Sequence, residues 1–350
     1  MKHPNVQIIK YSEIYKEDVI SLLQYIWTGM SENKRRQRFE WRYLNNPYQK
    51  QPLVYLAILD GKVVGFRPYV VQKFKLNNQI FTVFSNADTI VHPEHQGKGV
   101  FKILIQKFFN IEYPENSIVL NLSSNLKSTK GSVKEGLVPT NGIKTFSYKI
   151  SLFGLVKTLI QKRKIPHFFL PLTVSSKGYH ISISQSLDSD IISAFVEKNR
   201  NPNLLTNIRD KAFYDWRYAY DAEKFYYVYC YNKDGLQGYL ILKKNSDLLY
   251  TVEEFGNNSS KEFRIILKSV LKALRIPWLR SRVFSPSHKK SLNEAGFIPE
   301  PKILLKMTGK KHLPVLVSPT KANPTENDFL INGLDIRNIE NWEIHHTDKH

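Results

Sequence analysis

The residues best suited to chemistry lie in a short turn between an apolar strand and an amphipathic helix. Within the segment Asn86 to Phe101, Pro93 follows the strand, and Gly97 and Gly99 open the helix. Because glycine has no Cβ, the backbone at these two positions can approach a ligand closely and adopt unusual φ values. The free N–H groups at a helix start and the positive end of its dipole attract an anion. The pattern therefore predicts a phosphate-binding turn, and pyrophosphate is the group that we expect.

This turn resembles the coenzyme A (CoA) motif of the GNAT superfamily of N-acetyltransferases. In that motif a Gln or Arg, two residues, a Gly, one residue and a Gly or Ala follow a strand and open a helix. Gln96 and Gly99 match the pattern, and Phe101 stands where the pattern has its final small residue. The resemblance implies acetyl-CoA or a related acyl-CoA as cosubstrate. The cofactor-binding residues that it implies are Ile90, Val91, Gln96, Gly97, Lys98, Gly99, Val100, Phe101 and Asn125.

The same resemblance implies candidate catalytic residues. In such enzymes an amine attacks the thioester carbonyl directly, so the protein must place two substrates together and remove a proton. Asp88 lies on the motif strand, where the family often has a carboxylate that acts as a base; an ordinary strand-end carboxylate is the alternative interpretation. The family's frequent acid is a Tyr four residues before the Gly that ends the next helix, but counting back from Gly136 gives Ser132. Tyr148 is the substitute candidate for the acid, although a strand Tyr is more often a packing residue.

A repeated segment indicates the architecture. Phe39 to Tyr43 recurs as Phe213 to Tyr218, each time ahead of an apolar strand, an Asp-Gly turn and a second strand. Asp-Gly between two such runs is a strong hairpin signal, because Gly accepts the positive φ of a tight turn. Lys134 to Pro139 is matched by Asn293 to Pro299, where a short polar helix would end at Gly before a closing strand. Matching markers in matching order predict a duplication.

Each repeat is expected to fold as an α+β unit. In the first, Gln79 to Val91 and Ser117 to Ser123 are predicted strands, and Gly99 to Asn110 is a predicted helix with one apolar face. In the second, we predict a strand over Leu248 to Phe255 and a helix over Lys261 to Arg275. The resemblance implies tandem GNAT-like folds, each a mixed, mostly antiparallel sheet flanked by helices. The expected units are an N-terminal domain with the acyl-CoA site (1–150), a connecting segment (151–190), a degenerate C-terminal domain (191–310) and a C-terminal tail (311–350).

The second repeat lacks the glycine turn. At the corresponding position Gly256 is the single glycine, and Glu253 and Glu254 precede it as two acids that would repel a phosphate. We therefore expect one CoA site per chain, in the first half, and a second unit that is structural or shapes the acceptor site.

Composition favours a packed globular protein with anionic ligands. The chain has 42% apolar and 13% aromatic residues and a formal net charge of +20. A field of that sign favours a CoA phosphate, a nucleotide-linked sugar, an acidic lipid surface or a nucleic acid, although evenly distributed lysines are also a compositional habit. The single cysteine, Cys230, is interpreted as a buried strand residue; it excludes an internal disulfide and a cysteine-based metal cage, and we expect no metal site. With no apolar run of roughly 18 residues and no secretory signal, a cytoplasmic location is expected.

The predicted function is acyl transfer from acyl-CoA to an amine. The Trp-Arg-Tyr segment and the duplicated plan look like tandem GNAT proteins that are often associated with bacterial surface polysaccharide synthesis. This resemblance implies transfer of an acetyl or other short acyl group to a small molecule, such as an amino-sugar or its nucleotide- or lipid-linked form. An anionic acceptor and peripheral membrane contact both fit the charge, whereas nucleic acid is not expected. Two alternatives remain: a non-catalytic scaffold with the GNAT fold, and a basic RNA-binding protein.

Overall fold

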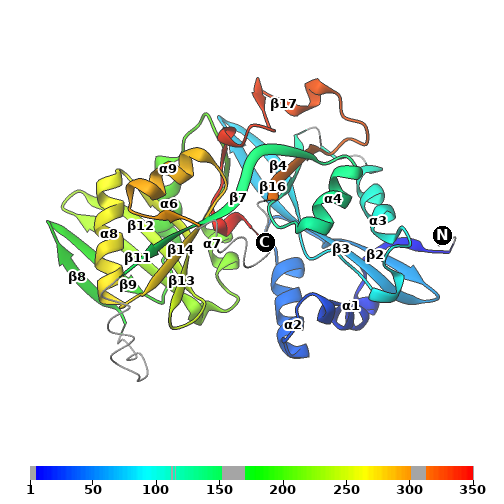
Figure 1. Cartoon of the computed structure of the whole chain (residues 1–350), viewed down its shortest axis with the longest axis horizontal. Helices are drawn as coiled ribbons and strands as arrows, with labels where there is room; N and C mark the ends of the chain where they lie inside the picture. The colour runs from blue at the N-terminus through cyan, green and yellow to red at the C-terminus, as the bar shows by residue number, and fades with distance from the viewer. Residues whose placement is uncertain (1–4, 112, 115, 152–169, 301–312, 350) are drawn as a thin grey trace.

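The computed structural model describes residues 5–111, 113–114, 116–151, 170–300 and 313–349. Two β-sheets lie side by side, one in each half of the molecule (Figure 1). The first sheet contains, in spatial order, β1 (Gln7–Lys10), β2 (Leu53–Leu59), β3 (Lys62–Leu76), β4 (Gln79–Asn86), β6 (Ser117–Asn121), β16 (Leu313–Pro319) and β7 (Val138–Ile150). The second contains β8 (Leu172–Ser176), β9 (Tyr179–Ser184), β11 (Phe225–Asn232), β12 (Gly235–Lys244), β13 (Leu249–Asn257), β14 (Trp278–Val283) and the end of β7. Each sheet has one parallel pair in this order, β4 with β6 and β13 with β14, among antiparallel neighbours. The α+β class and the mixed, mostly antiparallel sheets are confirmed.

Four short strands complete the sheets. Three of them pair with β3 or β7: β5 (Ile90–Val91) and β10 (Leu205–Asn207) with β3, and β15 (Ile298–Pro299) with β7. A fourth, β19 (Trp342–Glu343), pairs with β10, so the end of the chain is tied to both halves. Apart from these, β17 (Leu330–Ile331) and β18 (Leu334–Asp335) form a small hairpin.

The two halves exchange strands. The start of β7 pairs with β16 in the first sheet, and from Thr145 onward β7 pairs with β14 in the second. In return, β16 lies between β6 and β7. The boundary predicted at residue 150 therefore falls at the end of a strand that both sheets share. Residues 311–350, predicted as a tail, supply β16 to the first sheet.

Helices cover both faces of the first sheet (Figure 1). One face packs against α1 (Lys16–Leu22) and α2 (Glu32–Phe39), and the other against α3 (Val100–Phe109) and α4 (Leu126–Lys134). The apolar face predicted for α3 is the one that packs, because Leu104, Ile105 and Phe108 are buried.

The second half repeats this plan with α6 (Ser189–Asn199), α7 (Lys211–Arg217), α8 (Ser260–Ala273) and α9 (Pro286–Glu294). As predicted, α8 packs through an apolar face that includes Phe263, Ile266 and Val270. Cys230 is buried in β11, and burial raises the pKa of its thiol to about 11. In the part of the chain described, no helix is both long and apolar enough to cross a membrane.

The repeated Trp-Arg-Tyr motifs meet at the contact between the halves. Trp41, in η3 (Glu40–Leu44), donates its indole N–H to the carbonyl oxygen of Trp216 at 2.6 Å, and Trp216 donates to the carbonyl oxygen of Trp41 at 2.7 Å. Their rings are stacked, with centroids 5.9 Å apart. This reciprocal contact brings equivalent residues of the two copies together.

The acids of the second repeat do not lie in a turn. Glu253 and Glu254 are within β13, and Glu254 is fully buried. Its Oε1 accepts hydrogen bonds from the hydroxyls of Tyr214 and Tyr239, both at 2.6 Å. The prediction that these acids repel a phosphate at the start of α8 is therefore wrong, because the strand continues past them to Asn257.

Candidate active site

The site begins where the parallel pair of the first sheet separates. β4 and β6 pair from Thr82 with Ser117 to Ser85 with Leu120. Beyond this point the chain after β4 stays beside β3, where Ile90 in β5 pairs with Phe66. The two diverging segments line a cavity of about 700 Å³. Its walls come from α3 and α4 on one face of the sheet, and from α2, η3 and the second half on the other.

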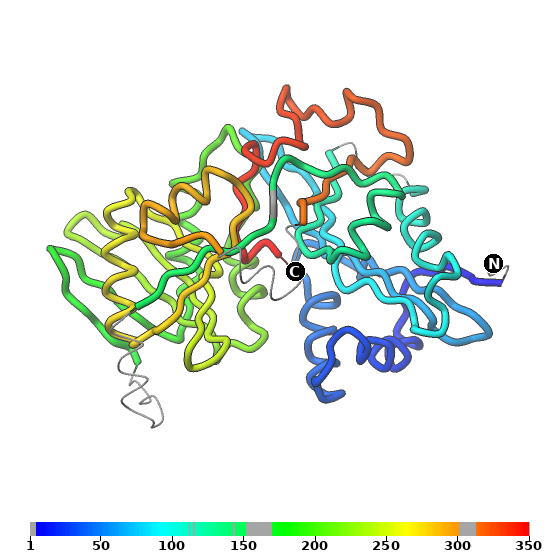
Figure 2. Tube along the Cα trace, in the orientation of Figure 1, coloured from blue at the N-terminus to red at the C-terminus, as the bar shows by residue number. Residues whose placement is uncertain are grey.

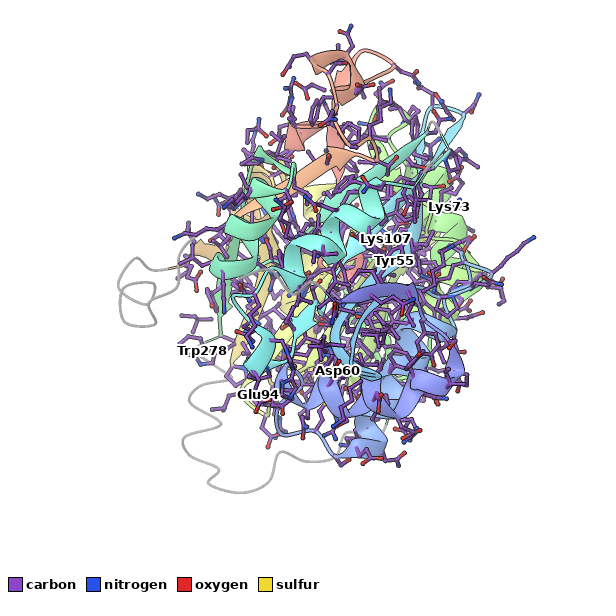
Figure 3. All side chains as sticks on the ribbon, turned by 90° about the vertical axis from the view of Figure 1, so that its right-hand side faces the viewer. Tyr55, Asp60, Lys73, Glu94, Lys107 and Trp278 are labelled. Atoms are coloured by element: carbon purple, nitrogen blue, oxygen red, sulfur yellow. The ribbon has the colours of Figure 1, made fainter. Side chains whose placement is uncertain are left out.

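The predicted phosphate turn has the backbone that its glycines suggest. Gly97 and Gly99 have φ values of 77° and 87°, and Gly99 immediately precedes α3. A Cβ at either position would meet no atom within 4 Å, so the space in front of the helix start is open. Both glycines are exposed. Glu94, in the short helix η4 (Pro93–His95) just before the turn, is exposed as well and is labelled at the surface in Figure 3. The first N–H groups of α3 have no acceptor within the helix and are free for an anion.

Side chains from two neighbouring elements fix this turn. Gln96 donates its amide N–H to the carbonyl oxygen of Val91 at 3.1 Å, and Lys127 of α4 donates to Oε1 of Gln96 at 2.9 Å. The departure from the motif at Phe101 has a local compensation, since a Cβ on Gly131 would lie 2.7 Å from Cε1 of Phe101. The absence of a side chain at Gly131 in α4 therefore makes room for the larger ring.

Asp88 lies between β4 and β5 in a left-handed conformation, with φ of 49°. Its Oδ2 accepts hydrogen bonds from Arg42 at 2.5 Å and from the Tyr43 hydroxyl at 2.8 Å. The Arg42 side chain is 3% exposed and that of Asp88 is 20% exposed, so the ion pair is largely buried. Burial raises the pKa of Tyr43 well above its usual range, so Tyr43 acts as a hydrogen-bond donor at neutral pH. Neither bond engages Oδ1 of Asp88, and Asp88 is among the residues that line the cavity.

Arg67 is a functional candidate that the sequence reasoning missed. It is 1% exposed in β3, donates through Nε to Tyr69 and through Nη1 to Thr89, and lies 5.7 Å from the ring centroid of Phe101. Among the described residues it has no acidic partner, and its Nη2 has no hydrogen-bond acceptor. A buried guanidinium without an anion is unfavourable, so a bound ligand is the expected acceptor. An Arg within the apolar strand from Val63 to Val71 was the signal that would have identified it.

The second half closes the cavity opposite α3 and α4. Arg217 occupies the place in the second Trp-Arg-Tyr motif that Arg42 has in the first, and its Nη2 lies 3.7 Å from Oε2 of Glu253. Its Nε donates to the carbonyl oxygen of Thr347 at 2.8 Å, which holds the C-terminal segment between the two halves (Figure 2). Lys243, His346 and Lys349 line the same cavity and were also not predicted.

The structure brings most of the predicted site residues together. Asp88, Phe101 and Asn125 line the cavity, Ile90 and Val91 form β5 beside it, and residues 96–100 surround the start of α3. Asn125 caps α4, accepting from the Ser128 N–H through Oδ1 at 2.9 Å. Ser132, which replaces the expected Tyr, also lines the cavity and is 1% exposed.

Tyr148 is not among the residues that line the cavity. It lies on the part of β7 that has crossed to the second sheet, and its hydroxyl donates to Glu300 at 3.3 Å. Burial raises its pKa. Strand exchange therefore separates this candidate acid from Asp88.

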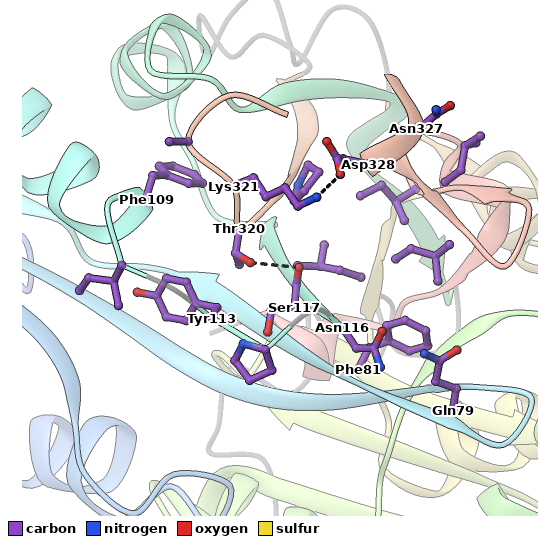
Figure 4. A pocket seen from close by; sticks show the side chains of 18 of the residues that line it. Gln79, Phe81, Phe109, Tyr113, Asn116, Ser117, Thr320, Lys321, Asn327 and Asp328 are labelled. Atoms are coloured by element: carbon purple, nitrogen blue, oxygen red, sulfur yellow. Dashed lines mark hydrogen bonds and ion pairs between the residues drawn. The ribbon is translucent and has the colours of Figure 1, made fainter. Parts of the chain in front are cut away.

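A second cavity of about 700 Å³ lies at the other end of the first sheet (Figure 4). Phe81, Tyr113 and Ser117 line one side, and the loop that carries the Lys321–Asp328 ion pair lines the other. None of the predicted site residues is part of its lining.

One group in the described chain has the residue types of a metal site: His92, Glu94 and His95, whose ligand atoms lie within 4.8 Å of one another. His92 Nε2 is 3.1 Å from the Tyr25 hydroxyl. The expectation that the protein has no metal site stays a prediction.

A known protein family matches most of the first half by sequence. Residues 7–122 match the family model described as the acetyltransferase (GNAT) domain, which includes the parallel pair, the glycine turn and α3. Among curated proteins, none matches the chain by sequence.

Solved structures resemble the whole chain. A probable N-acyltransferase of unknown function from Enterococcus faecalis has 10% identity and a TM-score of 0.65, covering 93% of this chain and 75% of that one. A GCN5-related N-acetyltransferase from Anabaena variabilis has 14% identity and a TM-score of 0.61, covering 91% and 73%. A tandem GNAT protein from the clavulanic acid biosynthesis pathway has 10% identity and a TM-score of 0.54, covering 92% of this chain and all of that one, 100%. These likenesses establish the tandem GNAT fold.

Proposed function

We propose that this chain, which has a GNAT domain and the tandem GNAT fold of N-acyltransferases, transfers an acyl group from acyl-CoA to a small-molecule amine. One observation carries the proposal: an open glycine turn, the gap between the diverging parallel strands and a cavity with a carboxylate occur at one place in the first half. A phosphate site alone would serve many ligands. The adjoining gap gives a long, narrow cosubstrate a path to the carboxylate.

We assign the cosubstrate a position along the elements on either side of the gap. Its pyrophosphate lies at the N–H groups of Gly97 to Phe101, and its pantetheine arm lies beside Ile90 and Val91. Asn125 supplies an amide N–H, since its Oδ1 is already used to cap α4. Arg67 supplies an additional buried donor.

The proton is removed by Asp88. Its Oδ1 accepts a proton from the ammonium form of the acceptor, while Arg42 and Tyr43 hold Oδ2 in place. The neutral amine then attacks the thioester carbonyl, the new C–N bond forms, and the C–S bond breaks. The leaving thiolate takes the proton that the nitrogen releases, which its ordinary pKa of about 8.5 allows without a dedicated acid.

The finer identity of the substrates is part of the same proposal. We take the acyl donor to be acetyl-CoA and the acceptor to be an amino-sugar, free or linked to a nucleotide or lipid, in a bacterial cytoplasm. The acceptor enters from the side of α2 and the second half, because α3 and α4 occupy the side of the CoA phosphates. The second unit then shapes the acceptor pocket and carries no CoA site of its own.

A thiol-release assay tests this function. Purified protein is mixed with acetyl-CoA and a panel of amino-sugars, and free CoA is followed by absorbance after reaction with a disulfide reagent. We expect release that requires an amine and that is lost in Gly99→Glu. If the folded protein releases no CoA with any amine above the background without protein, the proposed function is wrong.

A further inference from the structure

Cationic side chains are concentrated in the cavity. Six cations and two carboxylates line it, so positive charges outnumber negative ones by four. The six cations are Arg38, Arg42, Arg67, Arg217, Lys243 and Lys349, and the carboxylates are Asp88 and Glu253. Arg42 is neutralised by Asp88, and Arg217 lies 3.7 Å from Glu253.

The remaining cations on the acceptor side are not held in ion pairs within the described chain. Arg38 lies with its guanidinium 4.7 Å from the Trp27 ring centroid, and Lys243 lies 5.1 Å from that of Phe225. Arg38, Lys243 and Lys349 form no ion pair with any described residue. Cation–π contacts of this kind replace only part of the lost hydration.

The lowered pKa values of Lys349 and Lys243 agree with their lack of ion-pair partners among the described residues. Burial, and then the nearby Arg282, lower the pKa of Lys349 to about 7. Burial lowers the pKa of Lys243, which Glu253 opposes and Arg217 reinforces. Two lysines in such surroundings favour a ligand that brings negative charge.

We propose that the acceptor carries an oxyanion, a carboxylate or a phosphate, which Arg217, Lys243 and Lys349 bind while its amine lies at Asp88. This inference rests on the proposed function, because it assigns the second contact of that acceptor. It also gives the arginines of the two Trp-Arg-Tyr motifs separate roles: Arg42 holds the carboxylate that meets the amine, and Arg217 belongs to the group that binds the anion. Lys349 lies near both arginines, since Arg42 and Asp88 act on its charge and its carbonyl oxygen accepts from Nη2 of Arg217 at 3.5 Å.

Matched acceptors give the first test. Acetyl transfer is measured with glucosamine against glucosamine 6-phosphate, and with glycinamide against glycine, so that each pair differs in one anionic group. We expect a higher kcat/KM for the anionic member of one pair, by about tenfold or more for charge-assisted hydrogen bonds to two or three cations. The pair that shows the preference distinguishes phosphate from carboxylate. If both members of both pairs react equally well, the inference is refuted.

Two lysine variants make the test specific. Lys243→Met is expected to reduce turnover of the anionic acceptor about tenfold and that of its neutral partner less than twofold. The matched control is Lys244→Met, because Lys244 is the next residue, does not line the cavity and is paired with Asp247 at 2.7 Å. Equal losses for anionic and neutral acceptors in Lys243→Met would contradict the assigned role.

Direct binding separates this inference from the proposed function. Inorganic phosphate and acetate are titrated calorimetrically into the Gly99→Glu protein, in which the helix start of α3 is blocked, and into the Gly99→Glu/Lys243→Met double variant. We expect one of the two anions to bind the first protein and to bind the second at least tenfold more weakly. Anion binding here, together with no acyl transfer to any amine by the unsubstituted protein, would refute the proposed function but not the anion site. If neither anion binds the first protein, the anion site is refuted even if acyl transfer is observed.

Discussion

Replacement of Asp88 by Asn separates the structural and chemical roles of this carboxylate. Asn keeps the size and the acceptor oxygen, so the Tyr43 hydroxyl retains a partner. Arg42 loses its counter-charge although its side chain is only 3% exposed. Removing one partner of a buried ion pair costs about 3–5 kcal/mol, and the 20% exposure of Asp88 places this pair below that range. We expect a loss of about 2 kcal/mol in the free energy of unfolding.

Urea unfolding measures this loss against a matched control. Asp60 has the same φ of 49° as Asp88, lies in the exposed turn between β2 and β3, and has no such ion pair among the described residues. Asp60→Asn should therefore change stability by less than about 0.5 kcal/mol. If Asp88→Asn is as mild as Asp60→Asn, the short contact to Arg42 does not stabilise the fold.

The chemical role appears in the pH dependence of acyl transfer. Without the carboxylate the acceptor amine must lose its proton to water, so Asp88→Asn should be slower by about a hundredfold near neutral pH. The deficit should narrow as the pH rises toward the pKa of the amine, because an already neutral amine needs no base. A deficit that is the same at all pH values, or no deficit, would show that Asp88 has only a structural role.

Three further changes test separate parts of the structure. Gly131→Ala should weaken CoA binding several-fold in a calorimetric titration, because the new methyl group would lie 2.7 Å from Phe101 beside the helix start; unchanged affinity would show that the position of Phe101 does not matter. The pKa of Lys349 is lowered from 10.5 to about 7, so the unfolded chain binds the proton of this amine more tightly than the folded chain does. The free energy of unfolding should therefore rise with pH between those two values, by about 1.4 kcal/mol per pH unit and by up to a few kcal/mol in total. Lys349→Met should flatten that rise in urea unfolding at pH 7 and 10, whereas curves parallel to those of the unchanged protein would contradict the burial of this amine. Trp41→Phe and Trp216→Phe should each lower the free energy of unfolding by about 1 kcal/mol, since each removes one part-buried hydrogen bond between the halves; a large effect of one and none of the other would contradict the reciprocal contact.

Local features were predictable because they depend on a few neighbouring residues. The Asp60-Gly61 turn forms the expected hairpin, with Asp60 and Gly61 both at positive φ. The helix after Gly99 begins at Val100 and buries the predicted face. In both cases the backbone conformation follows from glycine and the packing follows from apolar periodicity.

Long-range pairing was not predictable from the same patterns. The apolar alternation of residues 138–150 indicates a strand, but it carries no information about which sheet each part of β7 joins. For this reason the exchange with β16, the removal of Tyr148 from the cavity and the return of Lys349 to it were all missed. Glu254 was misjudged for a related reason: a carboxylate in a strand can be buried when two tyrosine hydroxyls meet it from distant segments.

The stoichiometry of acetyl-CoA binding tests the central claim most directly. Calorimetric titration of the full chain should give one site per chain, and Gly99→Glu should abolish it, because a carboxylate at the start of α3 would block and repel the pyrophosphate. Gly61→Glu is the matched control, since Gly61 also has a positive φ, 75°, with open space around it, but lies in the β2–β3 turn; it should bind one equivalent. Two equivalents per chain, or one that persists in folded Gly99→Glu, would contradict a single acyl-CoA site in the first half.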